Sequence, residues 1–182
     1  MAGTVRAAVL LALLPGLAGC AMGYGFGLGV IVDTDGNVGG VASVRGSLGF
    51  SVDDGFGVSP TVALDGGGLG APAAGVVGPG VGVEVAAAVA DDALLVRGGP
   101  RVRFDLRFAG DGDRYDVEPG VAVAVLGVVA AEDFSYDAVG AEVQALLAID
   151  LEGRRDSSGV FLLSAVYDHW YLRVMRGIPG VR

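Results

Sequence analysis

The 182-residue sequence contains no lysine, one cysteine and one histidine. One cysteine cannot form an internal disulfide, and it excludes a metal cluster built on several thiolates. The histidine, His169, follows Asp168, and neighbouring strand residues point to opposite faces, so Asp168 cannot orient the imidazole. No serine stands at alternating spacing after His169 to serve as a nucleophile. We therefore expect no enzyme, no catalytic residue, no cofactor and no metal.

Positive charge is also scarce, since twelve arginines stand against twenty-one acids and the net charge is -9. A general nucleic-acid binder needs a basic surface for phosphate contacts, so nucleic-acid partners are not expected. The acids gather in short runs such as Asp53-Asp54 and Asp91-Asp92. Such runs are typical of turns, so much of the negative charge is predicted at loop tips.

The apolar run Ala7–Leu14 follows Arg6 and precedes small residues. This layout is typical of a secretory signal, and the run is too short for a spanning helix, which needs about 20 apolar residues. The next four residues are Leu17-Ala18-Gly19-Cys20. Here the chain resembles the precursors of bacterial lipoproteins, whose lipobox is Leu, a small residue, Gly or Ala, and Cys.

This resemblance covers only Met1–Cys20. It implies cleavage before Cys20, transfer of a diacylglycerol to the sulfur, and acylation of the new amino group. It predicts a signal peptide at 1–19, a lipidated N-terminus at 20–22 and a further domain at 23–182. Ala21, not Asp, follows the cysteine. By analogy with Gram-negative sorting, this favours an exported protein anchored in the outer membrane, with membrane lipid as its partner.

A period of two is clearest from Pro100 to Phe108, where apolar residues alternate with charged ones. Such alternation predicts a strand with two different faces. Most of the chain from Tyr24 to Met175 repeats the plan. In GYGFGLG, residues 23–29, glycines occupy one face, which suits a strand only where other chain segments approach closely.

An x-Pro-x-Val motif recurs with a spacing that fits one strand and one connection per repeat. Its prolines are Pro60, Pro79, Pro100 and Pro119. Because proline cannot donate to a sheet ladder, these positions predict strand starts or bulges at matching height. We expect loops at Gly66–Gly75 and Glu132–Asp137. Residues 138–151 include a helix-friendly QALLA, but their alternation favours a strand.

These patterns predict an all-β fold, an antiparallel meander of about eight strands of roughly 9–14 residues. Closing the meander into a barrel removes exposed edges. The pattern is also similar to that of small outer-membrane β-barrel families. This resemblance is architectural, with no specific motif.

Two closed arrangements remain open at this point. In a membrane barrel the apolar face meets lipid, and the charged face fills the interior. In a soluble barrel or sandwich the apolar face forms the core. The small residues on the polar face, the mixed charges and the scarcity of lysine and threonine favour the membrane barrel. Weak aromatic girdles oppose it, and lipid anchors and spanning barrels seldom coexist.

The charges expected to form an interior cluster carry both signs, so they can neutralise each other. They are Arg45, Glu84, Arg101, Arg103, Asp105, Arg107 and Glu142. We expect a non-catalytic, lipid-anchored outer-membrane barrel with a structural or interaction role. The alternative is a soluble, lipocalin-like barrel or sandwich that faces the periplasm and binds an apolar ligand. The sequence does not identify a protein partner, which stays unknown.

Overall fold

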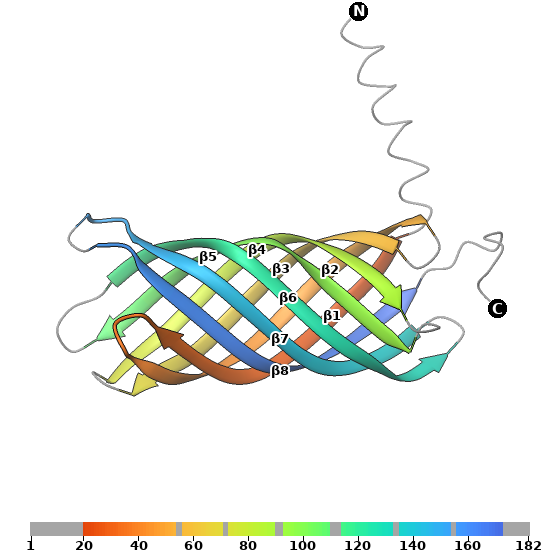
Figure 1. The fold of residues 1–182 in the computed structure, drawn as a ribbon, viewed down its shortest axis with the longest axis horizontal. Coiled ribbons are helices and arrows are strands. Elements are labelled where there is room, and N and C mark those ends of the chain that lie inside the picture. The colour runs from red at the N-terminus through yellow and green to blue at the C-terminus, as the bar shows by residue number, and fades with distance from the viewer. Residues whose placement is uncertain are drawn as a thin grey trace, which may run out of the picture.

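The computed structural model describes residues 20–53, 56–70, 73–89, 93–109, 114–132, 135–153 and 156–172; the expected signal peptide lies outside them. Eight antiparallel strands form a closed barrel in which each strand pairs with the next and the last pairs with the first (Figure 1). The predicted eight-stranded antiparallel barrel is therefore confirmed. The strands are β1 (Cys20–Asp33), β2 (Val38–Asp53), β3 (Phe56–Gly70), β4 (Ala73–Val89), β5 (Leu94–Ala109), β6 (Arg114–Glu132), β7 (Ser135–Asp150) and β8 (Ser158–Leu172).

β1 begins and β8 ends at the same end of the barrel, which we call the terminal end, and the opposite end is the far end (Figure 1). The strands run for 14 to 19 residues, which is longer than predicted. They lengthen at the expense of the predicted loops. β3 continues to Gly70 and β4 begins at Ala73, while β7 already begins at Ser135. Small residues lack strand propensity, but their backbones still pair once neighbouring strands are present.

The first hairpin turn is built on Asp35-Gly36. Residues 34–37 connect β1 and β2, and Gly36 has a φ of 87°. This left-handed backbone conformation suits glycine. Asp33 closes the turn, since its two carboxylate oxygens accept hydrogen bonds from the backbone and side-chain nitrogens of Asn37, each at 2.8 Å.

The four repeated prolines lie inside strands, so the prediction of strand starts or bulges is wrong. At each proline, two successive residue pairs are missing from one strand ladder. The register of the two strands is the same on both sides of this gap. Around Pro60, for example, Ser47 pairs with Thr61 and Phe50 pairs with Val58. The gaps at Pro79, Pro100 and Pro119 follow the same form. A missing N–H removes a rung locally, and the neighbouring rungs hold the register.

The barrel interior is packed with side chains from every strand. At the far end it holds an apolar cluster formed by Ile31, Val41, Val76, Leu146, Ala148, Val160 and Leu162. Nearer the terminal end a second cluster contains Leu95, Ala124, Leu126, Ala138 and Val166. Charged and other polar side chains occupy most of the remaining interior positions.

Inward-facing glycines make room for large side chains, as the alternating glycines of β1 suggested. A Cβ on Gly23 would lie 2.6 Å from the Trp170 ring, and one on Gly25 would collide with the Asp168 carboxylate. Gly78 of β4 serves an arginine in the same way, because a Cβ there would lie 2.8 Å from Cδ of Arg103. The Gly-rich face is therefore the crowded interior face.

Gly78→Ala is expected to destabilise the barrel by about 1–3 kcal/mol, the usual cost of overpacking a filled interior. The added methyl group would displace the Arg103 side chain, which lies against Gly78. The matched control is Gly75→Ala on the same strand, because a Cβ there meets no atom within 4 Å. Urea unfolding of both variants measures the difference. Equal midpoints would contradict the close packing of Arg103 on β4.

Candidate functional site

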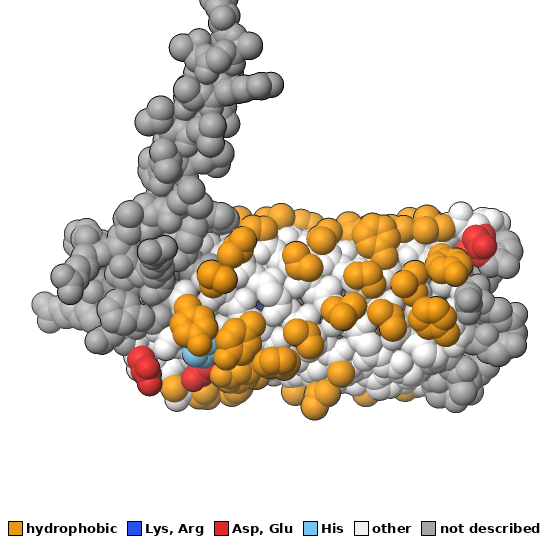
Figure 2. Space-filling model, turned by 180° about the vertical axis from the view of Figure 1, so that it is seen from behind, with side chains coloured by type: hydrophobic (Ala, Val, Ile, Leu, Met, Phe, Trp, Pro, Cys, Tyr) orange, Lys and Arg blue, Asp and Glu red, His pale blue; other side chains and the backbone are white. Residues whose placement is uncertain are grey.

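The polarity of this barrel is the reverse of that of a water-soluble one. Arginine and carboxylate side chains point inward and are nearly inaccessible, with Arg103, Asp105 and Glu118 at 0% exposure. Large apolar side chains point outward along all eight strands, and Phe104, next to Arg103, is 45% exposed. Figure 2 shows hydrophobic side chains spread over the visible wall from one end to the other.

All seven charges expected in the interior cluster lie inside the barrel. Each is at most 5% exposed: Arg45, Glu84, Arg101, Arg103, Asp105, Arg107 and Glu142. They form two groups linked by Arg101. Most of the cations come from β5, and all the carboxylates that surround them except Asp105 come from the other strands.

Near the terminal end, Glu142 of β7 is the centre of the first group. It lies 2.8 Å from an Arg45 nitrogen and 2.9 Å from an Arg97 nitrogen. Arg97 also contacts Glu84 at 2.7 Å and Asp168 at 3.0 Å. One guanidinium thus connects acids of β4, β7 and β8. It links these three strands through charge-assisted hydrogen bonds, which are stronger than hydrogen bonds between neutral groups.

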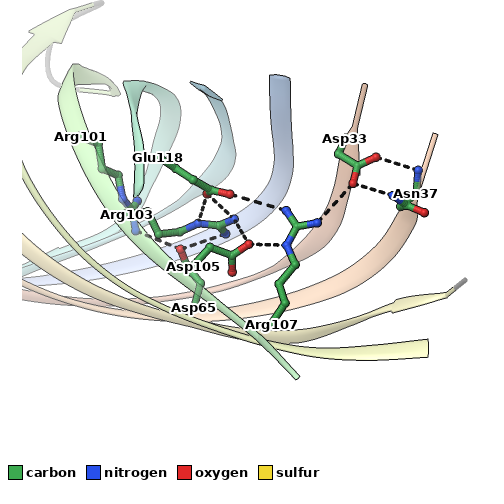
Figure 3. Close-up of polar contacts among 8 residues, drawn as sticks. All are labelled: Asp33, Asn37, Asp65, Arg101, Arg103, Asp105, Arg107 and Glu118. Carbon is green, nitrogen blue, oxygen red and sulfur yellow. Dashed lines mark hydrogen bonds and ion pairs between the residues drawn. The ribbon is translucent and has the colours of Figure 1, made fainter. Parts of the chain in front are cut away.

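Toward the far end, Arg103 and Arg107 form the second group (Figure 3). Two nitrogens of Arg103 reach Oε2 of Glu118 at 2.6 Å. Arg107 lies 2.7 Å from Asp105 and 3.4 Å from Asp33, which closes the β1–β2 turn. The group therefore joins β1, β5 and β6 around the turn at Asp33.

Arg101 connects the two groups through longer contacts. It lies 3.4 Å from Asp65 of β3 and 3.6 Å from Glu142. Asp65 in turn lies 3.7 Å from Arg103. The result is a continuous row of alternating charge along the barrel interior, with partners from every strand.

The sequence prediction missed several members of this row: Asp33, Asp65, Arg97, Glu118 and Asp168. Their positions in the alternating pattern of apolar and polar residues could have identified them. Arg97 has the same parity as Arg101 but precedes Pro100, where the pattern was taken to begin. Asp65 and Glu118 have interior parity, but they stand beside a predicted loop and a predicted strand start. Asp33 is the last residue of β1, where the alternation gives way to the first turn.

The interior is filled where these charges lie. A small recess lies at the terminal end, lined by Arg45, Glu84, Arg97, Asp168 and Trp170 among others. It has no room for a water molecule. A lipocalin-like ligand site needs an apolar cavity of several hundred cubic ångströms. The ion-paired side chains of the described strands occupy that place, which disfavours the soluble lipocalin-like alternative.

The outer wall carries a polar and aromatic group at the terminal end that the sequence did not predict. Across β7 and β8, Oδ1 of Asp137 lies 2.6 Å from the Tyr167 hydroxyl and 2.6 Å from Nδ1 of His169. The His169 ring packs against Tyr24 and Tyr171, at centroid distances of 5.1 and 4.4 Å. Asp168 lies on the opposite face from His169, as expected, and is buried in the interior, so the carboxylate that contacts His169 comes from the neighbouring strand instead.

This group is not arranged as a catalytic dyad. Nε2 of His169 is buried and has no hydrogen-bond partner among the described residues. No serine hydroxyl is thus placed for the imidazole to activate. In the part of the chain that the structure describes, no group of three His, Cys, Asp or Glu residues is arranged to hold a metal ion. No helix in that part is long and apolar enough to cross a membrane.

No protein-family model matches the sequence, and a search of curated proteins gave no match. Among solved structures, Neisserial surface protein A aligns over 82% of this chain and 95% of its own, with 14% identity and a TM-score of 0.55. Ail, the attachment invasion locus protein of Yersinia pestis, aligns over 83% and 98%, with 8% identity and a TM-score of 0.46. The first similarity supports the fold, and the second superposition is looser.

Proposed function

We propose that this chain is an integral outer-membrane β-barrel with a non-catalytic structural or interaction role, and that a lipid on Cys20 anchors it further. The observation that carries the proposal is the reversed polarity of the wall. Large apolar side chains such as Leu28, Val62, Phe104, Val121 and Leu163 are about half exposed or more. A continuous apolar surface of this kind belongs in contact with lipid.

The strands and the closed topology support the same proposal. A spanning strand needs about 9–11 residues at a tilt near 45°, and the shortest strand here has 14. Closure leaves no unpaired edge, which lipid does not tolerate. The fold shared with Neisserial surface protein A, a surface protein by its name, is consistent with this location.

The interior supports a closed barrel in place of a pore. The charged row and the two apolar clusters together fill the described interior. At the far end, successive strands are joined by segments of two to seven residues: 34–37, 71–72, 110–113 and 151–157. Segments this short provide little loop surface, so we propose that interactions involve the barrel wall and its rims.

The test is behaviour of the mature chain in membranes. The refolded protein is expected to require detergent, to stay with vesicles after an alkaline wash, and to migrate differently on gels before and after heating. In planar bilayers it should give no steady ion conductance. A monodisperse chain in plain buffer would contradict the membrane proposal, and large stable conductance would contradict the closed interior.

Cys20→Ser is expected to abolish lipid labelling and to leave unprocessed precursor, because a hydroxyl is a far weaker nucleophile than a thiolate. Cys20 is also the first residue of β1, so an attached lipid would enter the membrane at the terminal end of the barrel. Labelled palmitate incorporation in cells measures the effect. The matched control is Ser47→Ala, an interior change away from the lipobox, which should retain labelling. Normal labelling of the Cys20 variant would refute the lipid anchor.

A further inference from the structure

We propose that Asp137, with the rings of Tyr24, His169 and Tyr171, forms a site on the outer wall for the ammonium group of an ethanolamine phospholipid. This inference rests on the proposed membrane location. It concerns a site at the terminal end, outside the charged interior, and gives the barrel a preference for one lipid headgroup.

Asp137 lies on the outward face of the barrel wall. Its register partner His169 and the neighbouring pair of Val139 and Tyr167 lie on the outward face. Among the strand residues whose side chains the structure describes, the other outward carboxylate is Glu132, at the last residue of β6. A carboxylate is costly in hydrocarbon, so the third residue of β7 must lie at the level of the lipid headgroups.

The hydrogen bonds of Asp137 leave half of the carboxylate open. Oδ1 accepts from both Tyr167 and His169, each at 2.6 Å. No hydrogen bond or ion pair joins Oδ2 to the rest of the described chain, and the side chain is 31% exposed. Oδ2 is therefore free to accept a donor from outside the protein.

The surroundings of His169 indicate which ring nitrogen carries the proton. Nε2 of His169 is buried without a partner among the described residues, so a proton there would lose its hydrogen bond to water. The geometry fits the neutral ring with its proton on Nδ1, donated to Asp137. Asp137 then keeps its negative charge, and a cation is the complementary ligand.

The aromatic rings beside His169 also favour a cation. Tyr24 lies 5.1 Å from the His169 ring and 5.8 Å from Phe26, and Tyr171 lies 6.4 Å from Tyr24. Aromatic faces attract ammonium groups, and tyrosine suits the boundary between lipid and water. Choline would use the rings alone, because it has no N–H donor. Ethanolamine has three donors, so it satisfies Oδ2 as well as the rings.

The experiment counts lipid molecules retained by the full mature protein in native mass spectrometry. Ethanolamine, choline and glycerol phospholipids with identical acyl chains are titrated into the detergent micelle. We expect ethanolamine lipid to be retained about tenfold more than the other two, which is the effect of one charge-assisted hydrogen bond. Equal retention of choline lipid, or preference for the anionic glycerol lipid, would overturn the site. This comparison needs no variant.

Asp137→Asn keeps an acceptor for Tyr167 and His169 but removes the charge, so the preference is expected to disappear. Glu132→Gln removes the other outward carboxylate of the same end and should keep the preference. If the Asp137 variant keeps the preference for ethanolamine lipid, or if both variants lose it equally, the proposal is refuted. If the barrel inserts into membranes but shows no headgroup preference, only this inference is overturned. If the chain stays out of membranes, the proposed function is overturned too.

Discussion

Arg103→Ala is expected to lower the free energy of unfolding by about 3–5 kcal/mol, the usual effect of removing one partner from a buried ion pair. Arg103 is fully inaccessible and binds Oε2 of Glu118 through two nitrogens at 2.6 Å. Glu118 would keep only the 3.7 Å contact with Arg107. Truncation therefore leaves a carboxylate nearly unpaired where water does not reach it.

Urea unfolding in detergent measures this effect, with two controls. Val102→Ala changes the neighbouring residue outside the charged row and should stay within about 1 kcal/mol of the original chain. Arg103→Ala combined with Glu118→Gln should be less destabilising than the sum of the single changes, because the second removes the stranded charge. If Arg103→Ala leaves stability unchanged and the chain is soluble without detergent, the membrane-barrel proposal should be dropped.

The architecture was predictable because strand alternation is a local signal. From Arg101 to Arg107 every second residue is charged, so the sequence alone assigned Arg103 and Phe104 to opposite faces. The sequence did not decide which face points inward, since either face can form a closed interior. The structure resolves this through burial, with Arg103 at 0% exposure and Phe104 at 45%.

The partners of the charges were not predictable in the same way. Arg107 meets Asp33 across 74 residues of sequence, because strands tilt around the barrel and side chains from distant strands converge. Likewise, Asp137 meets His169 only through the register between β7 and β8. Alternation gives the face of a residue, whereas register and tilt decide its contacts, and those depend on the whole closed sheet.

Phe104→Arg is the complementary test on the outer wall, because its expected cost depends on whether that wall faces lipid or water. Phe104 points outward near the middle of β5 and pairs with Val117 of β6. If the wall faces lipid, the arginine must enter hydrocarbon, and the barrel loses about 2–4 kcal/mol near the midplane. If the wall faces water, the same change replaces an exposed ring by a soluble charge and costs less than about 0.5 kcal/mol.

Phe104→Leu is the matched control, because it keeps an apolar side chain at the same position. It should cost less than about 1.5 kcal/mol in either environment. Unfolding in lipid vesicles gives the free energies, and the heat-dependent shift on gels gives the folded fraction. A large loss for arginine with a small loss for leucine places this wall in lipid. An arginine variant as stable as the leucine variant places it in water, and the proposed outer-membrane role would then fail whatever the result at Arg103.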